Sequence, residues 1–165
     1  MNAKLVYLDS SSIVKRYIEE KGSAVIDAVY EEAEAGKLRF AFSIWNVGEV
    51  LGVFDRYASR GLLPEKMFRT ALLDFISEST KMARLDSLQI LPMTAKSLTA
   101  SWLLILKHHI YGADALQISS SKEAKCNLFL SADDKLVQTA GAEGIRAINI
   151  EVEPEKAFSE FKQAR

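Results

Sequence analysis

The chain has 165 residues, of which 48% are hydrophobic and 26% are charged, and its single cysteine, Cys126, excludes an intramolecular disulfide. These values are typical of one globular domain in a reducing compartment, so we expect a single domain over residues 1–165 and a cytoplasmic location. The formal net charge of −1 lacks the basic excess that is usual in nucleic-acid-binding domains. It leaves such binding open, because bound cations would offset acidic residues. No apolar run approaches the ~20 residues that a membrane-spanning helix requires, so we expect no membrane segment.

Short β-rich segments alternate with longer helical periods along the chain. The strands are expected at residues 4–8, 39–42, 89–91, 128–130 and 147–150. The helices are expected at residues 11–20, 22–34, 44–59, 64–85, 94–107, 113–125, 133–140 and 155–162. This alternation predicts an α/β fold in which helical crossovers join parallel strands.

The predicted helix 44–59 has two unlike halves, and the amphipathic helix 64–85 is expected to pack against it. The apolar half of helix 44–59 carries Val47, Val50, Leu51, Val53 and Phe54. Its other half carries Gly48, Glu49, Gly52 and Arg56. Each interior glycine costs about 1 kcal/mol relative to alanine, which indicates a close approach of backbone or ligand at this face. Trp45 and Trp102 are expected in the core rather than as platforms for bases.

Acidic residues lie at or near the ends of several predicted strands. Asp9 directly follows the first strand, and Asp133 lies just past the fourth. Asp114 opens the helix that leads into the fourth strand, and Glu49 lies about one and a half turns into the helix after the second strand. Open parallel sheets bind ligands outside the carboxyl ends of their strands. We therefore expect these four carboxylates to meet at one sheet edge.

Such a cluster is costly unless protonation or a cation offsets its charge. Two like charges about 4 Å apart repel by about 4 kcal/mol at an effective dielectric constant of about 20. An all-oxygen site without His or Cys suits a hard ion, which favours Mg²⁺ or Mn²⁺ over zinc or copper. Because metals in carboxylate clusters activate water for phosphodiester cleavage, the set indicates hydrolysis of a nucleic acid.

Each acid also has a purely structural interpretation. Asp9 and Asp133 precede helices and would act as N-caps, each stabilising by about 1 kcal/mol. Asp114 in a first turn would interact favourably with the helix dipole. Glu49 would be a solvated side chain paired with Arg56. The joint placement of all four at one end of one sheet favours the functional interpretation.

The ordered set of motifs resembles the PIN-domain nucleases, and most closely the VapC-type ribonuclease toxins of prokaryotic toxin–antitoxin pairs. The first two motifs are Asp9-Ser10-Ser11 after an apolar strand and Glu49 in the helix after the second strand. The others are Tyr111-Gly112-Ala113-Asp114-Ala115 and Ser131-Ala132-Asp133 after the apolar fourth strand. The resemblance spans residues 4 to about 150.

The resemblance implies three α/β/α layers around a five-stranded parallel sheet, and metal-dependent endonucleolytic hydrolysis of RNA. It implies a Mg²⁺ or Mn²⁺ site formed by Asp9, Glu49, Asp114 and Asp133. Supporting roles fall to Ser10, Ser131 and Asp134, and Asp133 is preferred to Asp134 as the ligand because it keeps the Ser-x-Asp spacing. The implied partners are an antitoxin and a second copy of the chain, with residues 44–85 as the candidate contact surface.

Three cations near the predicted acids are candidates for contacts with substrate phosphates: Lys15, Arg16 and Arg56. The alternative functions are a non-catalytic RNA-binding or scaffold protein of the same fold, and a Mg²⁺-dependent phosphatase. Phosphatases of the haloacid dehalogenase type carry the motif Asp-x-Asp after the first strand. In this chain, Asp9 is followed by Ser10 and Ser11. A scaffold would retain the repulsion among four acids without benefit, which argues against it.

Overall fold

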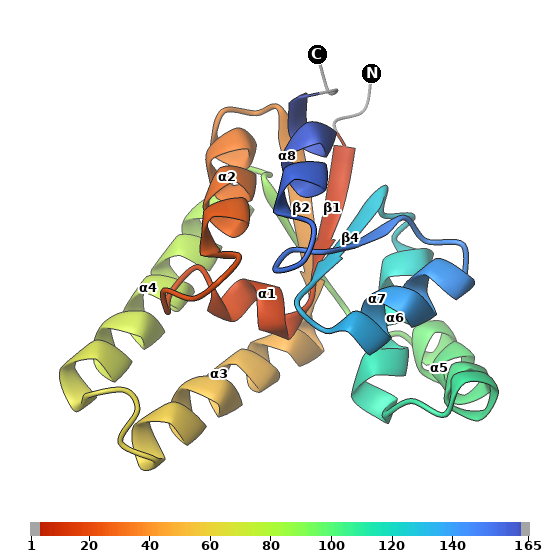
Figure 1. Ribbon diagram of the computed structural model, residues 1–165, viewed down its shortest axis with the longest axis horizontal. Helices are drawn as coiled ribbons and strands as arrows, with labels where there is room; N and C mark the ends of the chain where they lie inside the picture. Colours follow the sequence, from red (N-terminus) through yellow and green to blue (C-terminus); the bar gives the residue numbers. More distant parts are fainter. Residues whose placement is uncertain (1–3, 163–165) are drawn as a thin grey trace.

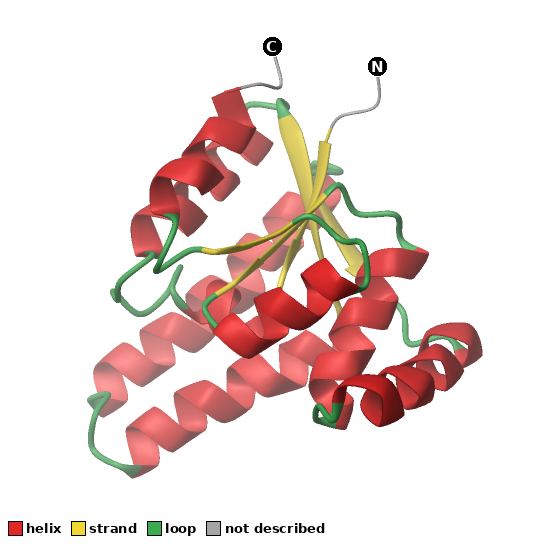
Figure 2. Cartoon of the chain, turned by 45° about the vertical axis from the view of Figure 1, so that its right-hand side comes forward, coloured by secondary structure: helices red, strands yellow, loops and turns green. Residues whose placement is uncertain are grey.

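The computed structural model describes residues 4–162 and has a parallel β-sheet at its centre (Figures 1 and 2). The strands are β1 (Lys4–Leu8), β2 (Leu38–Ser43), β3 (Leu88–Leu91), β4 (Leu128–Ser131) and β5 (Ala147–Asn149). They lie in the order β3-β2-β1-β4-β5, and each neighbouring pair is parallel. The predicted strands are confirmed, because their ends differ from the observed ones by no more than one residue.

Helices connect the strands and cover both faces of the sheet. They are α1 (Ser10–Val14), α2 (Ser23–Glu34), α3 (Ile44–Ser59), α4 (Glu65–Arg84), α5 (Ala95–His108), α6 (Gly112–Glu123), α7 (Asp134–Ala142) and α8 (Pro154–Lys162). Apart from α1, they match the predicted helices to within two residues at each end. Across residues 4–162, no helix is both long enough and apolar enough to cross a membrane.

The helix expected over residues 11–20 is wrong in its length, because α1 ends at Val14. Beyond it, backbone amides donate to carbonyls three residues earlier, which is the tighter turn that often closes a helix. The Lys15 ammonium then lies 2.9 Å from Glu20 and 2.6 Å from Glu151. These ion pairs hold the segment after α1 in turns against the loop that follows β5.

The side chains of each central strand alternate between two hydrophobic cores. Val6 and Leu8 of β1 belong to the larger core, which α1, α2, α3, α4 and α8 cover. Tyr7 belongs to the smaller core beneath α5, α6 and α7, where its ring stacks on Phe129 with 5.0 Å between centroids. The helices in Figure 1 accordingly lie on either side of the sheet. The predicted three-layer α/β/α architecture is confirmed.

The helical hairpin of α3 and α4 packs as expected but buries fewer side chains than its sequence predicts. Val50 and Phe54 of α3 are buried, whereas Leu51 and Trp45 are exposed. Figure 1 shows α3 and α4 extending away from the sheet, so only a narrow stripe of α3 meets the core. Trp102 on α5 is 55% exposed. The expectation that both tryptophans are core residues is therefore wrong.

The strand order places a reversal of the chain between β1 and β4. From β1 the chain adds β2 and β3 on one side, and it returns later to add β4 and β5 on the other. The backbone amide of Asp9, just past β1, donates to the carbonyl of Leu130 in β4 at 3.2 Å. Open α/β sheets bind ligands at such a reversal, outside the carboxyl ends of the strands.

Candidate functional site

Asp9 is buried at the end of β1 beneath several hydrogen-bond donors. The Ser131 hydroxyl donates to Asp9 Oδ2 at 2.6 Å, and the Ser11 hydroxyl lies 2.8 Å from both carboxylate oxygens. The backbone amide of Ser12 donates to Oδ1 at 2.8 Å, so Asp9 is also the N-cap of α1. Burial raises the pKa of Asp9, and these hydrogen bonds oppose the increase. The side chain is therefore fixed in orientation.

The turn after β4 is hydrogen-bonded to the turn after β1. Ser131 Oγ accepts the backbone amide of Asp133 at 2.9 Å, and Ser11 Oγ accepts that of Ala132 at 2.9 Å. The Asp133 side chain accepts a backbone amide of α7 at 3.0 Å and caps that helix. The N-cap interpretation thus holds for Asp133 as well as for Asp9. Capping and placement at the shared sheet edge are compatible in this structure.

Glu49 is held by polar side chains from three helices. The Ser10 hydroxyl of α1 donates to Glu49 Oε2 at 2.5 Å, and the Gln117 amide of α6 donates to the same oxygen at 3.2 Å. The Asn46 amide of α3 lies 3.5 Å from this oxygen and donates to Ser10 Oγ at 2.8 Å. Glu49 therefore turns toward α1 and α6, rather than extending into solvent as a side chain paired with Arg56.

Asn46 and Gln117 form a buried support for Glu49 that the sequence interpretation missed. Asn46 Oδ1 accepts the Tyr7 hydroxyl and the Ser43 backbone amide, each at 2.8 Å. Its Nδ2 donates to Gln117 Oε1 at 2.8 Å. A single Asn or Gln in a helix has no diagnostic spacing. The only signal was the capping box, in which Asn46 lies three residues after the N-cap Ser43.

Asp114 lies in the first turn of α6 and is influenced by the other predicted acids. Its pKa is raised to about 6, first by burial and then by three carboxylates: Asp133, Glu49 and Asp9. The positive charge of Lys135 opposes this increase. Because such effects fall off with distance, they favour the predicted approach of Asp133, Glu49 and Asp9 to Asp114.

The donor chemistry of this edge fits a hard divalent cation. All four candidate side chains offer carboxylate oxygens, the ligands that Mg²⁺ and Mn²⁺ prefer. Over residues 4–162, no group of three or more His, Cys, Asp or Glu side chains is placed so that it could hold a metal ion. Mg²⁺ commonly keeps several waters and takes only one or two protein carboxylates. A cation at this edge would therefore be bound by one or two carboxylates and by water.

Asp134, expected as a supporting residue, has a different partner from Asp133. Its Oδ1 accepts the side-chain amide of Asn149 at 2.6 Å, at the end of β5. Asn149 also donates to the Ala132 carbonyl at 3.3 Å. Asp134 is thus attached to the end of β5, and Asp133 is the one of the two that acts on Asp114.

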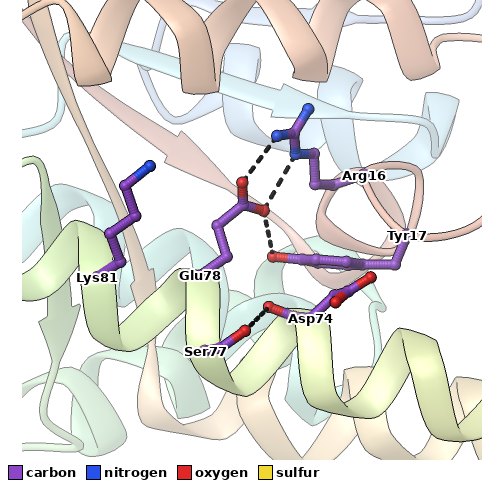
Figure 3. Close-up of a pocket in the computed structure, with 6 residues that line it drawn as sticks. All are labelled: Arg16, Tyr17, Asp74, Ser77, Glu78 and Lys81. Carbon is purple, nitrogen blue, oxygen red and sulfur yellow. Dashed lines mark hydrogen bonds and ion pairs between the residues drawn. The ribbon is translucent and has the colours of Figure 1, made fainter.

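The three cations expected near substrate phosphates differ in their surroundings. The Lys15 side chain is 4% exposed, and its ammonium pairs with two carboxylates. Arg16 donates to Glu78 at 3.1 and 2.7 Å and pairs with Asp27 at 2.6 Å. Figure 3 shows Arg16 and Glu78 in a cavity of about 500 Å³ beside α4. Both cations are engaged within the fold, whereas Arg56 is exposed on α3.

The comparisons with known proteins agree with this geometry. The family model for the PIN domain matches residues 6–142 of the chain. A comparison with curated protein sequences found no significant match.

Several solved structures share the fold at low sequence identity. VapC20 of Mycobacterium tuberculosis, described as a sarcin-ricin loop cleaving toxin, has a TM-score of 0.59 and 13% identity, covering 87% of this chain and 97% of that chain. VapBC2 of Rickettsia felis, bound to a DNA fragment from their promoter, gives the same four values. FitAcB of Neisseria gonorrhoeae has a TM-score of 0.60 and 16% identity, covering 88% and 97%. At these identities the likeness shows the fold.

Proposed function

The chain belongs to the PIN domain family, and on that premise we propose that it is a divalent-metal-dependent endoribonuclease, the toxin of a VapBC-type toxin–antitoxin pair. The observation that best supports the activity is that Ser131 links Asp9 to the backbone of Asp133 at one sheet edge, and that Asp133, Glu49 and Asp9 raise the pKa of Asp114. The toxin assignment is supported by the fold shared with VapC20 and VapBC2.

In this proposal the four acids would surround a partly hydrated Mg²⁺ or Mn²⁺, with Ser10 positioning Glu49 and Ser131 positioning Asp9. A bound cation would polarise a water molecule and the phosphodiester oxygens. The hydroxyls of Ser11 and Ser131 hold Asp9 in one orientation, so its carboxylate would need little rearrangement to bind a cation.

Glu49 has one oxygen engaged and one available. Over residues 4–162, the hydrogen bonds that Glu49 accepts from Ser10, Gln117 and Asn46 all go to Oε2. Oε1 is thus the atom that can accept a hydrogen bond from the attacking water or contribute to the cation. Because the Asn46 and Gln117 amides hold Oε2, the direction of Oε1 is set by the buried core.

The exposed side chains of the α3–α4 hairpin support the proposal of a protein partner. Apolar side chains exposed on this hairpin include Leu62, Met67, Leu73 and Ile76. Exposed apolar surface of this kind marks protein interaction sites. We propose that an antitoxin contacts residues 44–85, and the mass of the chain in solution, alone and with such a protein, would distinguish this partner from a second copy.

Incubation with RNA, DNA and a generic phosphomonoester, each with Mn²⁺, with Mg²⁺ and with a chelator, tests the activity. We expect cleavage of RNA that the chelator abolishes. Hydrolysis of the phosphomonoester alone would identify a phosphatase. Binding of RNA without cleavage in either metal would identify a scaffold or binding protein and would contradict the proposal.

A further inference from the structure

Two large aromatic side chains are exposed beside the acidic edge, on the same helices that carry Glu49 and Asp114. Trp45 in the first turn of α3 is 42% exposed, and Tyr111 at the N-cap of α6 is 81% exposed. We propose that Trp45 and Tyr111 are base-stacking residues that hold unpaired nucleotides of the substrate next to the four acids. This inference rests on the proposed function, and it assigns substrate positioning to two residues outside the acidic set.

Helix geometry places Trp45 next to Glu49. The two residues are four positions apart, so their side chains lie one above the other on the same face of α3. Side chains of a helix lean toward its N-terminus, which brings the Glu49 carboxylate toward the turn that carries Trp45. A base stacked on the indole would therefore hold its adjoining phosphate close to Glu49.

Tyr111 is close to Asp114 along the chain. It occupies the N-cap position of α6, without a capping hydrogen bond from its side chain, and Asp114 lies three residues later in the first turn. Helices α3 and α6 are joined by the hydrogen bond from Asn46 Nδ2 to Gln117 Oε1, at 2.8 Å. This contact fixes the start of α3 relative to α6, so the two aromatic residues belong to neighbouring elements that carry Glu49 and Asp114.

The face of α3 beyond Trp45 is open. No atom lies within 4 Å of the position that a Cβ would take at Gly48, and at Gly52 the nearest atom is Arg56 Nη1 at 3.5 Å. No backbone of the described residues approaches the two glycines, so the surface of α3 is open at these positions. Trp45, Glu49, Gly52 and Arg56 share this face. An aromatic ring, a bare backbone and a guanidinium in succession suit an unpaired strand, which needs stacking surfaces and cations along its phosphates.

Trp102 supplies a matched control, because it is exposed on α5 and has no acidic residue of the site on its helix. The chain has two tryptophans, so the Trp102→Phe variant reports only on Trp45 and the Trp45→Phe variant reports only on Trp102. Both variants carry Asp114→Asn to prevent cleavage during titration. The probe is a short RNA of mixed sequence in unpaired form, compared with the same sequence in a duplex.

We expect the unpaired RNA to quench the fluorescence of the Trp102→Phe variant and to leave that of the Trp45→Phe variant unchanged. Duplex RNA should quench neither. Trp45→Ala and Tyr111→Ala should each weaken binding of the unpaired RNA about ten-fold, whereas Trp102→Ala should bind it like the unsubstituted chain. Trp45→Phe should retain most of the affinity because it keeps a ring for stacking.

Cleavage by the otherwise unsubstituted chain separates the two proposals. If it cleaves RNA with Mn²⁺ but Trp45 fluorescence stays constant and both alanine variants bind normally, the stacking role is overturned and the nuclease function stands. If it cleaves no RNA in either metal, the nuclease function is overturned. Equal quenching of Trp45 by duplex and unpaired RNA would also overturn the stacking role.

Discussion

The Ser131 hydroxyl donates a hydrogen bond of 2.6 Å to Asp9 Oδ2, although the two residues are 122 positions apart in the sequence. The bond joins the ends of β1 and β4, on either side of the reversal in strand order. Ser131 also accepts the backbone amide of Asp133, so one hydroxyl orients two of the predicted acids. Ser131, the last residue of β4, thus has a direct structural role in the acidic edge.

Removal of this hydroxyl should weaken the site without unfolding the chain. In Ser131→Ala, Asp9 loses a charge-assisted donor, and we expect Mn²⁺ affinity to fall about 10- to 100-fold. Ser120→Ala is the matched control, because its buried hydroxyl has no hydrogen-bond partner among the described residues. Calorimetric titration with Mn²⁺ measures both variants. Equal affinities for the two would show that the Ser131 contact is irrelevant to metal binding.

Asn46 should be more important for stability than its position on a surface helix suggests. In Asn46→Ala, the buried Tyr7 hydroxyl and Ser43 amide lose their acceptor. Unsatisfied buried groups cost about 1–3 kcal/mol, so the free energy of unfolding should fall by about this amount. Gln138→Ala removes an exposed amide from α7 and should change it by less than about 0.5 kcal/mol. Denaturant unfolding measures the free energy of unfolding of both variants. Similar decreases in the two would contradict the role of Asn46 as a buried hydrogen-bond acceptor.

The ion pair of Arg16 with Glu78 should stabilise the fold without affecting cleavage (Figure 3). Glu78 accepts two hydrogen bonds from Arg16 and one from the Tyr17 hydroxyl at 3.1 Å. Glu78→Gln should therefore lower the free energy of unfolding by about 1.5–3 kcal/mol. Glu65→Gln breaks an exposed pair with Arg69 and should cost less than about 0.5 kcal/mol. Loss of RNA cleavage in Glu78→Gln at a temperature where it stays folded would instead place this pair in substrate binding.

Asp114 should make the metal-free protein less stable as the pH rises. Its pKa is raised from 3.8 to about 6 in the folded state, so between these values the folded chain binds more protons than the unfolded chain. The contribution of Asp114 to the free energy of unfolding is present below pH 3.8 and is lost as the pH rises through about 6. Asp114→Asn removes this titration.

The melting temperatures of the two proteins, measured in a chelator, test this linkage. The unsubstituted chain should lose stability relative to Asp114→Asn over this pH range. Mn²⁺ should reverse the loss, because a ligand at about 100 times its dissociation constant stabilises by about 2.7 kcal/mol. A difference between the two proteins that is constant with pH would contradict the proximity of the acids.

Much of the fold follows from local patterns in the sequence. The strand ending at Leu8 and the helix 44–59 were predictable because apolar alternation and helical periodicity depend on neighbouring residues. The end of α1 was not, because the turns after Val14 are held by the pairs of Lys15 with Glu20 and Glu151. The pair with Glu151, which follows β5, forms only after the strands are assembled.

The placement of two of the acids was predictable for a related reason. Asp9 directly follows β1 and Asp133 lies just past β4, so parallel topology alone brings them to one edge. Asn46 and Gln117 were not predictable, since their hydrogen bonds cross between α3 and α6 and have no spacing in the sequence. The exposure of Trp45 was equally hidden, because it depends on how far α3 extends beyond the sheet.

The most direct test of the acidic edge is RNA cleavage by Asp9→Asn and Asp114→Asn with Mn²⁺ present. Asparagine caps a helix about as well as aspartate, so Asp9→Asn should keep the fold, which circular dichroism and the melting temperature check. Asp74→Asn, an exposed acid on α4, is the control. We predict that both site variants lose more than about 100-fold in cleavage rate and the control loses none. Cleavage at the unsubstituted rate by folded Asp9→Asn and Asp114→Asn would contradict a role for these carboxylates in hydrolysis.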